Sequence, residues 1–275
     1  MCLPTELAEK RDQLLDLLRS YGSCAVAFSG GLDSTVLVKA AQLALGDHAV
    51  AVTGFSASMA TGELDEAAAL ARQIGIRHET VATRELSLPP YQANGPDRCY
   101  YCKTEVFARV EEVARRLGLA VVVDGSNRDD QSDYRPGLRA LRERNVRSPL
   151  YECRLSKAEI RQLATAWDLP VADKPATPCL ASRIAYGQQI TPDRLRMIDE
   201  AERFLRDRGF GPLRVRYHEG DLARIEVTVD QLPRLAEPAL RRELTERLRS
   251  LGFKYIALDL EGFRSGSMNA VLKTV

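Results

Sequence analysis

The sequence predicts an α/β protein: a doubly wound parallel sheet followed by a smaller α+β domain. Three observations lead to this fold class. Short apolar runs alternate with helical patterns, a glycine-rich turn joins the first run to a helix, and the pattern changes after about residue 185. Strands that alternate with helices form parallel sheets, and right-handed crossovers place helices on both faces. We expect two domains, spanning residues 1–185 and 186–275.

The elements of the first domain follow from hydrophobic periodicity. Apolar positions at helical spacing predict an amphipathic helix over residues 5–20. Helical patterns near residues 34–45, 61–74 and 103–117 separate the runs that we interpret as strands, CAVAF, HAVAVTG, RHETVAT and AVVVDG. Ligands of open α/β sheets bind at the carboxyl ends of the strands. The glycine-rich turn lies at one such end.

The second domain shows a different order of elements. The segment TPDRLRMIDEAERFLRDRG predicts a helix, with Pro192 in its first turn and Gly209 at its end. The segment PLRVRYHEGDLARIEVTV predicts two strands joined by a Gly-Asp turn. A helical stretch interrupted by prolines, DQLPRLAEPALRRELTERLRSLG, and a last strand, KYIALDL, complete this α+β unit.

Composition limits the classes of function. Lys and Arg number 39 and Asp and Glu number 38, so the net charge of +1 disfavours a protein that grips long nucleic acids. No apolar run reaches the roughly 20 residues of a membrane span, and the charged N-terminus does not resemble a signal peptide. We therefore expect a cytoplasmic protein without a membrane partner, whose six cysteines are reduced.

The turn Ser29-Gly30-Gly31-Leu32-Asp33-Ser34 predicts an anion site. Two glycines let backbone N–H groups approach an anion, and the following helix adds its positive end. Ser29 and Ser34 add hydroxyl donors. Asp33 indicates Mg²⁺, because a carboxylate beside a phosphate needs a cation between them. The alternative is a simple turn with a helix cap.

This segment resembles the pyrophosphate loop (PP-loop) of the ATP pyrophosphatases, which include NAD and GMP synthetases and several tRNA thiolases. The resemblance implies an adenine nucleotide alpha hydrolase-like domain that holds the β- and γ-phosphates of ATP. A substrate oxygen then attacks the α-phosphate, pyrophosphate leaves, and a nucleophile displaces AMP from the adenylate. Thr53 and Ser56 after the second strand, and Gly125 in D-G-S-N after the fourth, are the expected further ATP-binding residues. Ordinary strand-end packing and a polar turn are the alternatives.

Three cysteines are candidates for sulfur or metal chemistry. Cys99 and Cys102 form a C-x-x-C pair, a spacing typical of metal, cluster or redox sites. Cys179 lies in a proline-rich loop between the two predicted domains, followed by Ser182 and Arg183. A nearby guanidinium favours the thiolate form of a cysteine. Buried packing is the alternative for Cys179.

Taken together, six motifs resemble the ATP-dependent sulfur transferases that help to build the nickel-pincer nucleotide of lactate racemase. They are S-G-G-L-D-S, D-G-S-N, R-P-G-L-R-A, P-C-L-A-S-R, R-V-R-Y-H and G-F-R-S-G-S-M-N. The resemblance implies adenylation of a pyridinium dicarboxylate mononucleotide and replacement of AMP by sulfur, giving a thiocarboxylate. It also implies that Arg214 and Arg216 bind the substrate phosphate and that the protein is a homo-oligomer, a hexamer. We expect Ser182 and Arg183, which follow Cys179 closely, to bind the substrate as well.

The source of sulfur separates two versions of this activity. In the best-known members of the family, the cysteine that Cys179 matches gives up its own sulfur. Here three cysteines could ligate three irons of a [4Fe–4S] cluster and leave the fourth iron open for an extra sulfide. We expect this cluster on Cys99, Cys102 and Cys179. The alternatives are a sacrificial or persulfide Cys179, a zinc site, a tRNA thiolase, an ammonia-dependent ligase and a nucleotide-binding module without activity.

Overall fold

The computed structural model describes residues 3–132, 136–175, 177–264 and 267–268. Contacts within the chain divide it into two compact units, and the chain crosses between them repeatedly. The first unit comprises Met1–Ser56, Gly62–Glu85 and Cys99–Thr177, and the second comprises Ala57–Thr61, Leu86–Arg98 and Pro178–Val275. Domain boundaries at residues 185 and 186 stay a prediction.

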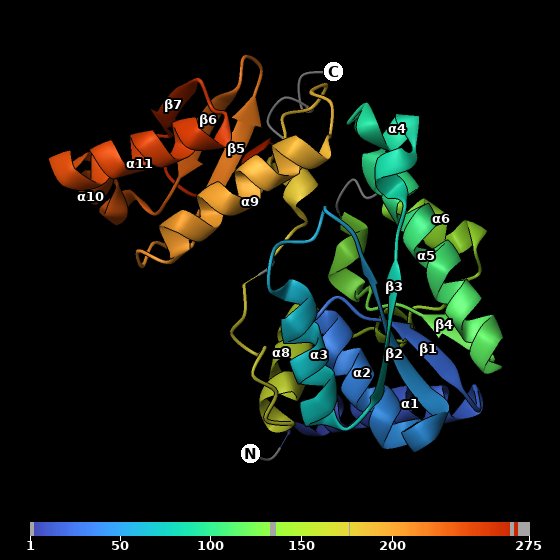
Figure 1. Cartoon of the computed structure of the whole chain (residues 1–275). Coiled ribbons are helices and arrows are strands. Elements are labelled where there is room, and N and C mark those ends of the chain that lie inside the picture. Colours follow the sequence, from blue (N-terminus) through green and yellow to red (C-terminus); the bar gives the residue numbers. More distant parts are fainter. Residues whose placement is uncertain (1–2, 133–135, 176, 265–266, 269–275) are drawn as a thin grey trace. The chain divides into compact units, whose positions relative to one another are not determined.

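A four-stranded parallel sheet forms the first unit, in the order β3-β2-β1-β4 (Figure 1). The strands are β1 (Cys24–Ala27), β2 (Ala49–Phe55), β3 (Arg77–Ala82) and β4 (Val121–Val123). Cys24 is in register with Ala49 on one side and with Val121 on the other. The predicted α/β class and its four parallel strands are thus confirmed.

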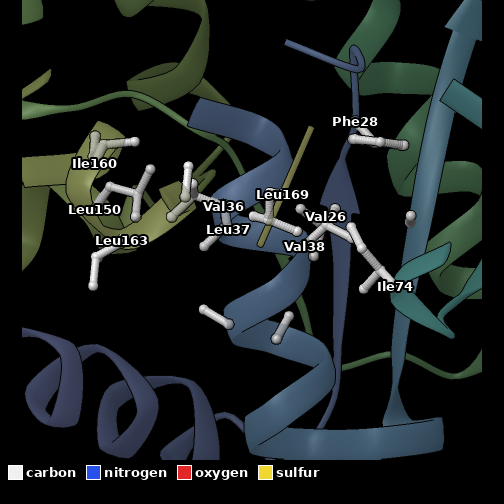
Figure 2. Close-up of a cluster of buried hydrophobic side chains, with 14 of the residues drawn as sticks. Val26, Phe28, Val36, Leu37, Val38, Ile74, Leu150, Ile160, Leu163 and Leu169 are labelled. Atoms are coloured by element: carbon white, nitrogen blue, oxygen red, sulfur yellow. The ribbon is translucent and has the colours of Figure 1, made fainter. Parts of the chain in front are cut away.

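Helices cover both faces of this sheet because alternate residues of the strands are buried on opposite sides. Cys24 and Val26 pack with α1 (Thr5–Ser20), α2 (Leu32–Leu45), α3 (Glu63–Ile74) and α8 (Lys157–Ala166). Ala25 packs on the other face with α5 (Arg98–Leu117), and α6 (Gly137–Glu143) packs against α5. Figure 2 shows Val36, Leu37 and Val38 of α2 within the hydrophobic core that α1, α2, α3 and α8 form with Cys24 and Val26.

The second unit is built on a three-stranded sheet in the order β5-β6-β7. β5 (Arg214–His218) and β6 (Leu222–Glu226) form the predicted antiparallel pair, and β7 (Tyr255–Leu258) lies parallel to β6. Val215 and Tyr217 are buried on one side of β5, so the alternating Arg214 and Arg216 lie on the opposite face. The helices of this unit are α9 (Pro192–Arg206), α10 (Leu232–Ala236) and α11 (Pro238–Leu251).

Short helical elements connect these parts of the chain. They are η1 (Gly46–His48), η2 (Glu85–Ser87), α4 (Pro89–Gln92), η3 (Arg128–Ser132), α7 (Pro149–Glu152), η4 (Leu180–Arg183) and η5 (Val229–Gln231). No helix among the described residues has the length and apolar character needed to cross a membrane.

Candidate functional site

The glycine-rich turn connects β1 to the first turn of α2, as the sequence predicts. Gly30 has a φ of 69°, in the left-handed region that favours glycine. A Cβ at Gly30 would lie 3.5 Å from the Cβ of Ala67 on α3. Gly31 is the N-cap of α2 and supplies no side chain to the orphan N–H groups of the helix. An anion is the natural partner of such a helix end.

Hydroxyl groups hold the loop in shape. The Ser29 N–H donates to Ser34 Oγ over 3.3 Å, and the two hydroxyl oxygens lie 3.1 Å apart. Ser34 Oγ in turn donates to the Gly31 carbonyl over 3.1 Å, and the Gly31 N–H lies 3.4 Å from Ser29 Oγ. These bonds close the turn on itself, so the loop is organised before any phosphate arrives.

Asp33 meets a lysine from a distant helix. Lys157 Nζ donates to Asp33 Oδ2, while Asp33 Oδ1 is buried and has no hydrogen-bond partner among the described residues. A buried carboxylate oxygen without a partner suits a hard cation such as Mg²⁺. The oxygen donor at Asp33 therefore fits the magnesium that the sequence predicts there, and Lys157 places a positive charge beside the loop.

A capping box positions Lys157 at the start of α8. The Ser156 side chain accepts from the Glu159 N–H, and the Glu159 carboxylate accepts from the Ser156 N–H. Lys10 Nζ of α1 lies 2.6 Å from Glu159 Oε1. Burial opposes ionisation of Glu159, but the hydrogen bonds from Lys10 and Ser156 outweigh it and lower its pKa to about 2.

Gly125 touches the backbone of the loop directly. A Cβ at this position would lie 3.0 Å from Ser34 N and 3.2 Å from the carbonyl carbon of Asp33. Its neighbour Asp124 is buried and accepts hydrogen bonds from the hydroxyls of Ser126 and Ser148, each over 2.6 Å. Only glycine lets the D-G-S-N turn approach the start of α2 so closely.

Thr53 and Ser56, which the sequence predicts to bind ATP, both make hydrogen bonds within the protein. Thr53 is fully buried, and its hydroxyl lies 2.8 Å from His78 Nε2. Ser56 donates to Glu85, a carboxylate that is 2% exposed and whose Oε2 has no partner among the described residues. ATP contacts by Thr53 and Ser56 stay a prediction.

The three candidate cysteines differ from two others in exposure. Cys99 and Cys179 are exposed and Cys102 is partly exposed, whereas Cys24 and Cys153 are buried. Burial raises the pKa of Cys24 to about 12 and that of Cys153 to about 11. The three predicted thiols are therefore the accessible ones of these five, and access is one requirement for a thiolate that binds a metal or acts as a nucleophile.

The candidate cysteines are distributed over both units. Cys99 and Cys102 lie one turn apart at the start of α5 in the first unit, and Cys179 belongs to the second. Within the described part of the chain, no group of three or more His, Cys, Asp or Glu side chains is arranged to hold a metal ion. Convergence of the three thiols stays a prediction.

Arg183 organises the backbone around Cys179. Its guanidinium donates to the carbonyls of Pro178 and Cys179, the latter over 2.9 Å. Arg183 Nε also lies 3.1 Å from Glu202 Oε1, and both side chains are almost fully buried. Arg183 therefore shapes the loop that carries Cys179 and is neutralised by Glu202.

Two further arginines gather on the same unit. Arg216 pairs with the buried Glu226 over 2.8 Å and donates to the Ser182 carbonyl over 3.2 Å. Its Nε is buried without a hydrogen-bond partner among the described residues. Burial, with the charges of Arg183 and Arg216, lowers the pKa of Arg214 to about 10. A bound anion would relieve this crowding of positive charge.

Comparison with known proteins decides the family. A pyridinium-3,5-bisthiocarboxylic acid mononucleotide synthase of Lactiplantibacillus plantarum is 38% identical over 97% of this chain and 96% of its own length. This chain belongs to the same family of ATP-dependent sulfur transferases, within the PP-loop ATP pyrophosphatases. The asparagine synthase family model matches residues 11–104, which include the PP-loop, Cys99 and Cys102. The protein is an ATP-using enzyme that transfers sulfur.

Other relatives of this sulfur transferase match over similar lengths. An uncharacterised protein of Synechocystis is 44% identical over 97% of this chain and 99% of its own length. An uncharacterised protein of Methanocaldococcus jannaschii is 30% identical over 87% of this chain and 90% of its own length.

Two residues near the candidate site were not predicted from the sequence, and four residues of the quoted motifs lie outside the described part of the chain. Sequence reasoning missed Lys157, although the S-K-A-E capping box before an apolar run signals the helix that carries it. It also missed Glu85, for which no local signal exists. Four residues of the quoted motifs lie outside the described residues: Arg135, Ser265, Gly266 and Asn269.

Proposed function

We propose that this sulfur transferase adenylates one carboxylate of a pyridinium dicarboxylate mononucleotide and replaces AMP with sulfur. The product is a thiocarboxylate for the synthesis of a nickel-pincer cofactor. The observation that carries the proposal is the full-length match to the Lactiplantibacillus enzyme, whose name states a bisthiocarboxylic acid mononucleotide as its product.

The PP-loop unit supplies the first half-reaction. A substrate carboxylate oxygen attacks the α-phosphorus of ATP, and the bond from the α-phosphorus to pyrophosphate breaks. The start of α2 faces the departing phosphates with its positive end, and Lys157 adds a countercharge. Asp33 would hold Mg²⁺, which supplies further neutralisation of the phosphate charge. AMP then leaves far more readily than an oxide ion would.

The second unit supplies groups that suit the anionic substrate. Arg214 and Arg216 lie on the sheet face opposite the core, and an arginine fork matches the geometry of a phosphate. Ser182 and Arg183 belong to the same unit, directly after Cys179. Binding the substrate here would bring its carboxylate to the loop that carries Cys179.

Sulfur transfer is the second half-reaction. A sulfide sulfur attacks the carbonyl carbon of the adenylate, the carbon–oxygen bond to AMP breaks, and one proton is released. A [4Fe–4S] cluster on Cys99, Cys102 and Cys179 would supply that sulfur repeatedly. Three accessible thiols fit the donor set of such a cluster, and the i, i+3 spacing at the start of α5 puts two of them on one face.

Iron analysis tests the cluster directly. Protein reconstituted without oxygen should hold about four irons and matching acid-labile sulfide per chain. Cys99→Ala should remove most of this iron and leave Mg-ATP binding intact. Cys153→Ala is the matched control, because Cys153 is buried in the first unit away from solvent. Wild-type protein without iron would reject the cluster and return Cys179 to a sacrificial or persulfide role.

We also propose the partners, the oligomeric state and the location of the enzyme. The net charge of +1 supports a small-molecule substrate over tRNA. From the family resemblance we also propose a homo-oligomer, a hexamer, that works in the cytoplasm with no membrane partner. Light scattering coupled to size-exclusion chromatography measures the oligomer, and a monomer at micromolar concentration would reject that part.

A further inference from the structure

Arg224 is the central charged residue on one face of the second sheet. It is in register with Arg216 on β5 and with Ala257 on β7. Two arginines directly opposite each other on neighbouring strands repel, so this pair needs anions beside it. The side chain of Arg216 is 6% exposed and that of Arg224 is 23% exposed, so water screens the pair only weakly. The groups that bind Arg224 therefore affect how Arg216 can act.

One carboxylate binds both arginines. Glu226 is fully buried, and its Oε2 accepts a hydrogen bond from Arg216 Nη2 over 2.8 Å. Its Oε1 lies 3.0 Å from Arg224 Nη1 and accepts from the Ser267 hydroxyl over 2.9 Å. A single negative charge thus serves two guanidinium groups and neutralises Arg216 only in part. Arg216 Nε is buried without a hydrogen-bond partner among the described residues.

Two further groups hold Arg224 in this position. Its Nη1 also donates to Asp259, which follows β7. Its Nε donates to His218 Nε2 on β5 over 3.1 Å, which requires the neutral imidazole with its proton on Nδ1. Burial, with the charges of Arg224 and Arg216, lowers the pKa of His218 and so favours that neutral form. Arg224 is thus bound from β5, from β6 and from the end of β7.

We infer that Arg224 is a positioning residue for recognition of the substrate phosphate. Its guanidinium binds Oε1 of Glu226, so that only Oε2 holds Arg216. Without Arg224, the full charge of Glu226 would act on Arg216, and Asp259 would add an unpaired negative charge nearby. Both changes would weaken the attraction of Arg216 for an anion. The inference rests on the proposed function, in which Arg214 and Arg216 bind the phosphate of the mononucleotide.

The test compares two ligands that differ only in the phosphate. They are the pyridinium dicarboxylate mononucleotide and the corresponding riboside, and calorimetry measures the affinity of the full chain for each. Wild type should prefer the mononucleotide. Arg224→Gln should weaken mononucleotide binding about tenfold, as loss of one charge-assisted hydrogen bond does, and leave riboside binding unchanged.

Arg247→Gln is the matched control. It removes one positive charge from the same unit, but Arg247 pairs with Glu200 over 2.6 Å and its side chain is 37% exposed. Its affinity for both ligands should match wild type. An equal loss in Arg247→Gln and Arg224→Gln would overturn the inference, because net charge alone would then explain the effect.

The remaining outcomes separate the inference from the proposed function. A wild-type preference for the mononucleotide in folded Arg224→Gln, or an equal loss for both ligands, would overturn the inference. If Arg224→Gln does not fold, Arg224→Lys replaces it, because lysine keeps the charge but lacks the planar fork that makes these contacts. Arg224→Lys should lose part of the preference, and an unchanged preference would overturn the inference. Equal affinity of wild type for both ligands would instead reject the proposed phosphate site.

Discussion

Lys157 places a positive charge beside the PP-loop. Its ammonium binds Asp33, whose other oxygen is buried without a partner among the described residues. We predict that Lys157→Met weakens Mg-ATP binding at least roughly tenfold, because charge-assisted hydrogen bonds contribute about 1.5–3 kcal/mol. Calorimetry measures this affinity. Lys174→Met is the control, since Lys174 forms a surface ion pair with Glu66, and an equal loss in both variants would refute a specific role.

A second prediction for a single residue concerns Gly125. The Cβ of Gly125→Ala would meet the backbone of Ser34 at 3.0 Å, and backbone cannot move aside as a flexible side chain can. We expect the start of α2 to shift and pyrophosphate release to fall roughly tenfold or more. In Gly137→Ala the nearest atom is a Lys103 side-chain carbon at 3.1 Å, so pyrophosphate release should stay near wild type. Equal rates in both variants would contradict the close approach.

At the scale of elements, helix α8 carries both Lys157, which binds Asp33 of the PP-loop, and Glu159, whose charge contributes to the stability of the fold. The pKa of Glu159 is lowered to about 2 against an ordinary value of 4.5, because hydrogen bonds from Lys10 and Ser156 outweigh burial. A lowered acid pKa stabilises the fold above about pH 4.5, and this contribution is lost as the pH falls towards 2. We predict that Glu159→Gln removes on the order of 2 kcal/mol at pH 7 and flattens that part of the acid dependence.

Denaturant unfolding from pH 7 downwards measures this effect. The difference in unfolding free energy between wild type and Glu159→Gln should shrink as the pH falls below 4.5. A difference that stays constant with pH would show that packing of α8, and not the carboxylate charge, determines the loss.

The PP-loop and helix α8 show which parts of the site the sequence predicts and which parts it does not. The strand, the turn and the start of α2 around Ser29–Ser34 were predictable, because the apolar periodicity, the glycines and the acidic residue at the helix start are all local signals. The α8 helix also has a local signal in its capping box. Its pairing with Asp33 has none, because 124 residues separate Lys157 from Asp33 and only tertiary packing brings them together.

The surroundings of Cys99 and Cys102 depend on how the chain crosses between the two units, which no local sequence pattern encodes. Cys99 and Cys102 follow a short segment of the second unit, Leu86–Arg98, that lies early in the chain. The sequence predicts one change of pattern near residue 185, whereas the contacts place two earlier segments in the C-terminal unit. The prolines of Leu86–Arg98 mark a break in periodicity, but a local break does not say which unit the segment packs in.

At the scale of the whole molecule, charge separates a small-molecule enzyme from a tRNA thiolase. Lys and Arg exceed Asp and Glu by only one residue. We predict that labelled tRNA shows no saturable binding at about 150 mM salt, because phosphate contacts alone supply little affinity there. Fluorescence anisotropy measures this. Tight binding that falls steeply between about 50 and 200 mM salt would favour the tRNA thiolase instead.

The number of product molecules per chain distinguishes catalytic sulfur transfer to a carboxylate from transfer of the sulfur of Cys179 itself. The cluster-loaded enzyme is incubated without oxygen with ATP, sulfide and the pyridinium dicarboxylate mononucleotide, and mass spectrometry follows both product and protein. We predict several thiocarboxylates per chain and an unchanged mass at Cys179. A single product per chain, with a loss of about 34 Da at Cys179 as one H₂S leaves, would contradict this prediction.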